Sequence, residues 1–133
     1  MSLTYEAARD FLYREARYLD DKQWDDWLEM YARDASFWMP AWDDRDQLVE
    51  NPQTDISLIW YANRSGLEDR VFRIRTERSS ATVPDTRTSH NISNIELIGQ
   101  ADGLCKLRFN WHTLSFRYNV VDHFYGTSFY TLD

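Results

Sequence analysis

Residues 95–118 read IELIGQADGLCKLRFNWHTLSFRY, and this stretch decides the fold class. Apolar residues at positions 107, 109 and 111 alternate with polar ones, which is typical of a strand that buries one face. Asp102 and Gly103 separate that strand from the apolar run before it, and Asp-Gly between two such runs is a strong hairpin signal. The sequence therefore predicts two long antiparallel strands joined by a tight turn.

The apolar alternation changes phase within the second of these strands. Before residue 112 the apolar residues stand at odd positions, whereas from residue 114 they stand at even ones. Because one extra residue exchanges the two faces of a strand, we expect a β-bulge or sharp bend near His112 and Thr113. The run HFYGTSFYTL, residues 123–132, predicts a further strand with a second bend at Gly126.

Two helices are predicted at the start of the chain. Apolar spacings of three and four predict a helix over residues 5–19, capped by Thr4, and a shorter helix from Trp24 to Tyr31. An acidic loop is expected over residues 43–55. It lies between two short apolar runs that predict strands, ASFWMPAW at 35–42 and ISLIWY at 56–61.

A third helix is predicted after these runs, because Ser65 and Glu68 match a capping box and apolar residues follow at positions 67, 71 and 74. Three helices followed by long antiparallel strands describe an α+β fold in which a curved sheet wraps round helices. At 133 residues and 43% hydrophobic content, the chain is expected to form one domain over residues 1–133.

The composition also bears on the location of the protein. No apolar run approaches the ~18 residues of a membrane-spanning helix, and the first residues lack the order of a signal peptide. Cys105 is the single cysteine, so an intramolecular disulfide is excluded and a reducing compartment fits. We therefore expect a cytoplasmic protein.

Charge is unevenly distributed along the chain, whose net charge is −7. Residues 1–55 contain 14 acidic and 6 basic residues, whereas residues 70–90 contain five Arg and two acidic residues. An acidic chain without a basic aromatic stripe argues against nucleic acid as a partner. Arg clusters in such chains often recognise carboxylates or form protein interfaces.

The residue types exclude several kinds of metal site. A Rieske cluster needs two Cys and two His, and Cys-rich zinc sites also need more than one cysteine. The three His, at positions 90, 112 and 123, lack the helical spacing that makes a mononuclear iron motif specific. Acid–base chemistry by His112 or His90 with Asp34 remains open at this point.

Three long stretches match, in order, one known family: LYREARYLDDKQWDDWLEMYARDASFWMPAW (12–42), GLEDRVFRIRTERSS (66–80) and PDTRTSHNISNIEL (84–97). Together they resemble the small (β) subunit of aromatic ring-hydroxylating dioxygenases, in particular those that act on benzoate. The resemblance covers nearly the whole chain.

The resemblance implies a cone-shaped, cystatin-like α+β fold, shared with ketosteroid isomerase and scytalone dehydratase. It implies an α3β3 hexamer in which the small subunits form a trimeric base. The large (α) subunit would carry the Rieske 2Fe-2S cluster and a mononuclear Fe(II). The implied reaction inserts both atoms of O2 into a benzoate-type ring to give a cis-dihydrodiol carboxylate, with electrons from NADH through a separate reductase.

For this chain the resemblance implies a structural role without catalytic, metal-binding or cofactor-binding residues. PDTRTSHNIS, residues 84–93, is expected to fix a strand and a subunit contact. Family members usually continue past a YTLD-like segment with another strand, whereas this sequence ends at Asp133, which leaves open whether that strand is absent from the protein or only from the sequence. The candidate interface residues are Arg70, Arg73, Arg78, Arg87, His90 and Asn94.

A second hypothesis is an autonomous dehydratase or isomerase of the same fold, with a pocket His and a carboxylate. A deep pocket holding His112 or His90 within hydrogen-bond reach of a carboxylate would favour it. The subunit hypothesis predicts an interior filled by large aromatic side chains, namely Trp24, Trp27, Phe37, Trp38, Phe109 and Trp111.

Overall fold

A computed structural model of the protein describes residues 3–40, 57–79 and 86–133. By its internal contacts the chain divides into two compact units, residues 1–27 with 83–133, and residues 28–82. The predicted acidic loop at 43–55 lies outside the described residues. Two helices, two short strands, a third helix and three long antiparallel strands follow one another in the order that the sequence predicted, and the α+β class is confirmed.

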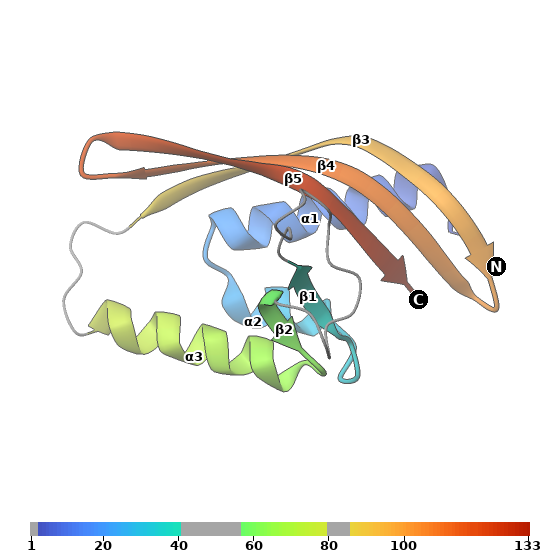
Figure 1. The fold of residues 1–133 in the computed structure, drawn as a ribbon, viewed down its shortest axis with the longest axis horizontal. Helices are drawn as coiled ribbons and strands as arrows, with labels where there is room; N and C mark the ends of the chain where they lie inside the picture. Colours follow the sequence, from blue (N-terminus) through green and yellow to red (C-terminus); the bar gives the residue numbers. More distant parts are fainter. Residues whose placement is uncertain (1–2, 41–56, 80–85) are drawn as a thin grey trace. The chain divides into compact units, whose positions relative to one another are not determined.

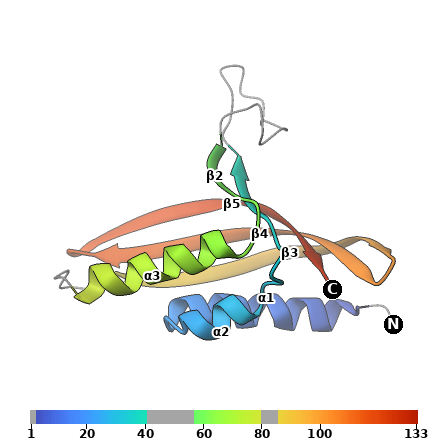
Figure 2. The same cartoon turned by 90° about the horizontal axis from the view of Figure 1, so that it is seen from below.

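The first unit is a helix on an antiparallel sheet of three strands in the order β3-β4-β5 (Figure 1). Helix α1 packs along one face of this sheet, closest to β3, as Figures 1 and 2 both show. The elements of this unit are α1 (Tyr5–Asp20), β3 (Arg87–Ala101), β4 (Leu104–Arg117) and β5 (Val120–Leu132). Helix α2 (Trp24–Glu29) begins in this unit and ends in the other.

Helix α1 begins and ends with side-chain and backbone caps. The hydroxyl of Thr4 accepts a hydrogen bond from the amide of Ala7 at 3.1 Å, which confirms the predicted cap. At the other end Lys22 adopts a left-handed conformation, with φ of 59°, and the amide of Gln23 donates to the carbonyl of Tyr18 at 2.8 Å. A lysine therefore closes this helix in the position that glycine usually takes.

The hydrophobic core of the first unit lies between α1 and the sheet. Ala8 and Leu12 of α1 are fully buried against alternate residues of β4. Those β4 residues are Cys105, Leu107 and Phe109. Of the six aromatic residues predicted to point inward, Trp27 and Phe109 are buried, and Trp24, Phe37, Trp38 and Trp111 are half-buried.

Two tight turns join the three long strands. Asp102 and Gly103 have φ of 54° and 77°, as expected for the predicted Asp-Gly hairpin. Tyr118 and Asn119, with φ of 53° and 59°, make the second turn, so β5 begins at Val120. The sequence pattern placed the last strand at residues 123–132, because a tyrosine is uncommon at positive φ and gives no turn signal.

The predicted bulge near His112 and Thr113 is wrong. Strand β4 pairs with β5 in one unbroken register from Cys105 to Arg117. Thr113 is buried on the same face as Phe109, so the face alternation continues through a polar residue. The register shifts instead in β3, between Ser93 and Glu96 and again before Gly99. A buried threonine interrupted the apolar pattern without any change in the backbone.

Gly126 lies opposite Trp111 in the β4–β5 ladder, and no register shift occurs there. A Cβ at Gly126 would come within 2.8 Å of Cζ2 of Trp111. The glycine therefore makes room for the indole ring, a role that the sequence did not reveal.

The second unit contains the other predicted strands and the third helix. Strands β1 (Phe37–Pro40) and β2 (Ser57–Tyr61) pair antiparallel and lie side by side in Figure 2. Helix α3 (Ser65–Ser79) buries Leu67 and Val71, which confirms the predicted stripe.

The capping box predicted for α3 is wrong in detail. The side-chain oxygen of Asn63 accepts from the amide of Ser65 at 2.9 Å, so Asn63 caps the first amide. Glu68 instead pairs with Arg64 at 2.9 Å.

None of the helices within the described residues is both long and apolar enough to cross a membrane.

Candidate functional site

Asp20, the last residue of α1, binds three groups on strand β3. Its two carboxylate oxygens lie 3.0 and 3.1 Å from the backbone amide of His90, which donates to them, and one of them accepts from the hydroxyl of Thr88 at 3.0 Å. The third group is the ring of His90, whose Nδ1 lies 2.5 Å from Oδ1 of Asp20. An ionised carboxylate only accepts hydrogen bonds, so Nδ1 carries the proton. The site fixes both the tautomer and the orientation of His90.

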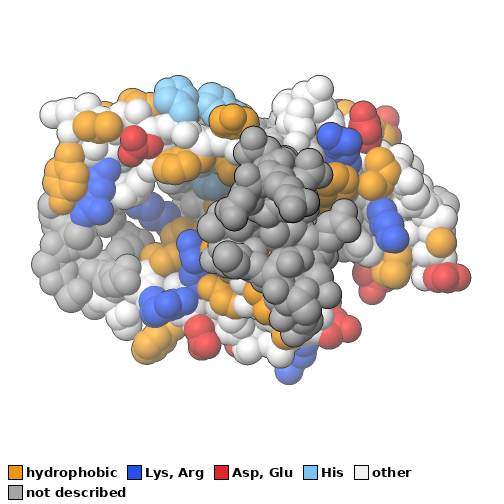
Figure 3. Space-filling model, in the orientation of Figure 1, with side chains coloured by type: hydrophobic (Ala, Val, Ile, Leu, Met, Phe, Trp, Pro, Cys, Tyr) orange, Lys and Arg blue, Asp and Glu red, His pale blue; other side chains and the backbone are white. Residues whose placement is uncertain are grey.

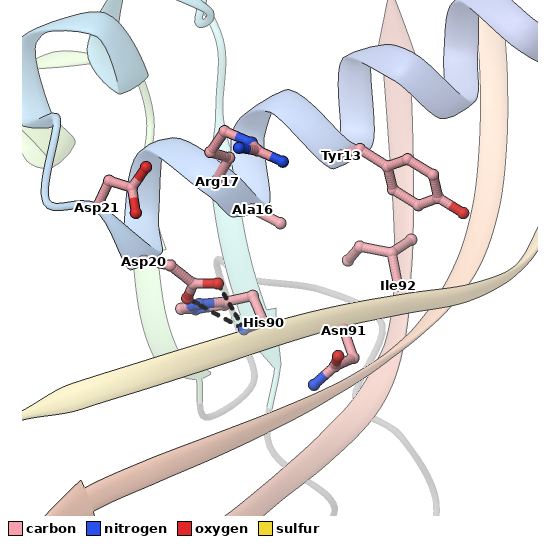
Figure 4. A pocket seen from close by; sticks show the side chains of 8 residues that line it. All are labelled: Tyr13, Ala16, Arg17, Asp20, Asp21, His90, Asn91 and Ile92. Atoms are coloured by element: carbon pink, nitrogen blue, oxygen red, sulfur yellow. Dashed lines mark hydrogen bonds and ion pairs between the residues drawn. The ribbon is translucent and has the colours of Figure 1, made fainter.

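A surface hollow of about 430 Å³ opens beside this pair, between α1 and β3 (Figure 4). Tyr13, Arg17, Asp21 and Asn91 line it and are themselves exposed, which makes it an open depression rather than an enclosed pocket. The other lining residues are Ala16, Asp20, His90 and Ile92. Small-molecule sites usually bury most of their ligand, and this depression cannot.

The acid that binds His90 is Asp20, and not Asp34, a pairing that the sequence had left open. Seventy residues separate Asp20 from His90, and the first 55 residues hold 14 acids, so sequence alone gave no means of choosing among them. The position of Asp20 in the sequence was the one feature that could have identified it as the partner of His90. Asp20 directly follows the apolar stripe of the first predicted helix, where a side chain can reach the neighbouring strand.

His112 and His123 pair with each other instead of with a carboxylate. Nε2 of His112 lies 3.0 Å from Nδ1 of His123, and the ring centres are 5.3 Å apart with planes inclined by 13°. That spacing is as long as the hydrogen bond plus the two ring radii, so the rings meet edge to edge and one ring nitrogen donates a hydrogen bond to the other. The pair lies on the face of the sheet opposite to α1, because both residues alternate with the core-facing positions.

The three histidines are thus divided between the two faces of the sheet. Within the described ranges no group of three or more His, Cys, Asp or Glu side chains is arranged to hold a metal ion.

The outer face of the sheet, opposite to α1, carries aromatic and basic side chains. The guanidinium of Arg87 lies 4.8 Å from the ring centre of Phe116, and that of Arg108 lies 5.5 Å from the ring centre of Phe129. Figure 3 shows His and hydrophobic side chains side by side along the upper edge of the molecule, where the sheet lies. Such a surface is typical of protein contacts rather than of catalysis.

The predicted interface residues fall on two elements. Arg70 and Arg73 are exposed on α3, and the side chain of Arg78 lies outside the described part of the chain. Arg87 lies on the outer face of β3. Asn94 has φ of 55° and lies within the register shift of β3, where asparagine tolerates the left-handed conformation.

One buried residue that ties elements together was not predicted. Glu15 of α1 is 7% exposed and accepts from the indole of Trp27 at 3.1 Å and from the hydroxyl of Tyr130 at 2.8 Å. A glutamate on the apolar side of a helix is the signal that could have revealed it, because buried carboxylates need hydrogen-bond donors.

Comparison with known proteins places the chain among dioxygenase subunits. The toluate 1,2-dioxygenase subunit beta of Pseudomonas putida is 78% identical over 133 residues, which is 100% of this chain and 82% of the relative. The benzoate 1,2-dioxygenase subunit beta of Acinetobacter baylyi is 66% identical, over 99% of this chain and 78% of the relative.

Solved structures agree with these relatives. The beta subunit of the benzoate 1,2-dioxygenase from Burkholderia mallei superposes with a TM-score of 0.87 and 56% identity, covering 98% of this chain and 80% of that one. A chain of naphthalene 1,2-dioxygenase, 20% identical with a TM-score of 0.78, covers 95% of this chain and 68% of that one and shows the shared fold. The family described as "Ring hydroxylating beta subunit" matches residues 14–133, and the chain belongs to this family.

Proposed function

We propose that this chain is the small subunit of a dioxygenase that oxidises benzoate or its methyl derivatives, the toluates, and that it supplies structure rather than catalytic groups. The observation that carries this proposal is the 78% and 66% identity to toluate and benzoate dioxygenase subunits, over 100% and 99% of this chain. Sequence identity this high along the whole chain argues against a different function for a protein that merely shares the fold.

The partner in this proposal is a large subunit, in an α3β3 hexamer within the cytoplasm. The large subunit would hold the Rieske 2Fe-2S cluster and the mononuclear Fe(II), and a separate reductase would deliver electrons from NADH. The support for this division of labour is the similarity to relatives that are named as beta subunits of toluate and benzoate dioxygenases. The product would be the cis-dihydrodiol carboxylate.

The residues proposed to contact other subunits are those on β3 and α3. Arg70, Arg73 and Arg87 are exposed, as contact residues must be before assembly. Arg78 and Asn94 belong to the same proposal, and so does His90, although His90 already has a partner within its own chain.

We also propose that residues 1–133 act as one domain, since the family match runs through both compact units.

The alternative of an autonomous dehydratase or isomerase has one observation in its favour, namely the hydrogen bond between His90 and Asp20. Three features oppose it. The hollow beside His90 is open, the Asp20 carboxylate is already engaged by two further donors, and the family consists of dioxygenase subunits. The pair is better explained as a structural link between α1 and the sheet.

Co-expression with the large subunit of a toluate or benzoate dioxygenase tests the proposal. We expect co-purification, a hexameric mass, and turnover of benzoate and toluates when NADH and the reductase are supplied. The variant His90→Ala should leave turnover per assembled hexamer within twofold of the parent. A hundredfold loss at full assembly would mean that His90 takes part in the chemistry, and absence of any complex would overturn the subunit assignment.

A further inference from the structure

Two histidines on neighbouring strands meet on the outer face of the sheet. In the β4–β5 ladder His112 is opposite Tyr125, and His123 is opposite Leu114. The two histidines are therefore diagonal neighbours on one face, which is within the reach of long side chains. Nε2 of His112 lies 3.0 Å from Nδ1 of His123. The register of the two strands is unbroken from Cys105 to Arg117, so the backbone fixes both residues relative to each other.

The distance between the two nitrogens is that of two ligands on one metal ion. Zinc binds imidazole nitrogen at about 2.0–2.1 Å, so two such ligands are about 2.9 Å apart at a bond angle of 90° and about 3.3 Å apart at the tetrahedral angle. The observed 3.0 Å lies between these two values. Imidazole is the commonest metal ligand in proteins and binds through either of its nitrogens.

Metal binding requires only a rotation of the two rings. Their planes are inclined by 13° and their centres are 5.3 Å apart, so the lone pair that accepts the hydrogen bond points along the line between the nitrogens. At a bond angle of 90° each ring must tilt by about 45° to direct a lone pair at a common ion. Both side chains are exposed, and within the described part of the chain each ring hydrogen-bonds only to the other. The rings can therefore tilt at the cost of that one hydrogen bond.

The cationic side chains of the same face lie too far away to prevent binding of a cation. Arg108 stands four residues before His112, and Arg87 is opposite Phe116, four residues after it. Four residues of strand span about 13 Å, which exceeds the Debye length of about 10 Å at 0.1 M salt. The two guanidinium groups are also held over Phe129 and Phe116, the residues directly opposite them, rather than over the histidines.

We propose that His112 and His123 form a binding site for a divalent transition-metal ion that prefers nitrogen ligands, such as Cu²⁺, Ni²⁺ or Zn²⁺, and that the ion links β4 to β5. The two imidazoles supply two of the four or more ligands that such ions take, so water completes the coordination and the ion exchanges readily. The inference does not depend on the proposed function, because it concerns only two strands of this chain.

Titration of the purified, untagged chain with NiCl₂ tests the site by calorimetry, after a chelator has removed other metals and has itself been dialysed away. We expect one Ni²⁺ per chain, and the variant His112→Gln/His123→Gln should weaken binding at least tenfold. The matched control Asn110→Ala/Thr127→Ala changes a neighbouring pair on the same face of the same strands, whose side chains hydrogen-bond to each other at 3.1 Å. This control should bind Ni²⁺ as tightly as the parent. Thermal unfolding shows that each variant is folded.

The preference among ions tests the nature of the ligands. Cu²⁺ should bind more tightly than Ni²⁺, and Mg²⁺ should not bind, which is the order expected of imidazole ligands. Binding should be weaker at about pH 5.5 than at about pH 7.5, because imidazole binds a metal only in its neutral form.

Hydrogen exchange tests the position of the ion. Amides of β5 around His123 should exchange more slowly when Ni²⁺ is present, because the ion links this strand to β4. The variant His112→Gln/His123→Gln should show no such change.

Two outcomes would overturn the proposal. One is binding of Ni²⁺ by the double histidine variant with the affinity of the parent, which would place the ion elsewhere in the chain. The other is a folded parent chain that binds neither Ni²⁺ nor Cu²⁺ when either ion is in large excess over the protein.

Discussion

Asp20 holds both the backbone amide and the ring of His90, across 70 residues of sequence. The two residues join the end of α1 to the edge of the sheet, at a place where each side chain is about a quarter exposed. The pair is therefore a structural junction, and its contribution is measurable as stability.

Removal of the Asp20 carboxylate should destabilise the fold. Asp20→Ala leaves the amide of His90 and the hydroxyl of Thr88 without their partner, and we expect a loss of about 1–3 kcal/mol in the free energy of unfolding. Urea unfolding measures this loss. The neighbouring exposed Asp21→Ala is the control and should change stability by less than about 0.5 kcal/mol. If the two variants lowered the free energy of unfolding equally, the contacts of Asp20 with β3 would make no measurable contribution to stability.

Glu15 should couple energetically to both of its donors. Tyr130→Phe removes one donor and leaves the Trp27 bond, so we expect a loss of about 0.5–1.5 kcal/mol, whereas Glu15→Ala removes the acceptor of both bonds and should cost more. A double-mutant cycle by chemical unfolding tests the pair. In the Glu15→Ala background, Tyr130→Phe should cost less than in the parent by the energy of the Tyr130–Glu15 bond; strict additivity would contradict that interaction.

Two glycines of the sheet offer a matched comparison. Gly126→Ala places a methyl group within 2.8 Å of the Trp111 indole, and forcing that ring aside should cost about 1–3 kcal/mol. Gly99→Ala meets no atom within 4 Å and serves as the control. Thermal unfolding compares them. Trp111→Leu should make Gly126→Ala much less costly, and persistence of the full cost in that background would rule out the steric explanation.

Unfolding should be cooperative across the two compact units if residues 1–133 form one domain. Hydrogen exchange under increasing urea can follow amides of β4 in the first unit and of α3 in the second. We expect their slowest-exchanging amides to open with the same free energy within about 1 kcal/mol. Opening of α3 at a much lower free energy, with β4 still protected, would show that the units unfold separately.

The elements that the sequence predicted well are those determined by local chemistry. The cap at Thr4 and the turn at Asp102 and Gly103 depend on neighbouring residues only, and both appear as expected. The turn at Tyr118 and Asn119 was missed because surrounding structure, rather than local preference, holds a tyrosine at positive φ.

The features that sequence could not supply depend on distant partners. Thr113 is buried because its strand is covered, although its polarity suggested a break in the pattern. Asp20 and Glu15 acquire their roles from residues 70 and 115 positions away, respectively. The family resemblance predicted the fold class and the family correctly, but no contact of this kind follows from it.

The junction at Asp20 also affects the edge of the sheet at which another strand can pair. An exposed strand edge invites other strands to pair with it, and a carboxylate already occupies the amide of His90 on the outer edge of β3. At the other edge, β5 has a neighbour on one side only among the described strands. A strand that adds to β3 at His90 would have to displace this carboxylate, so a charged or proline substitution meant to protect the protein from aggregation is better placed on β5 than at this part of β3.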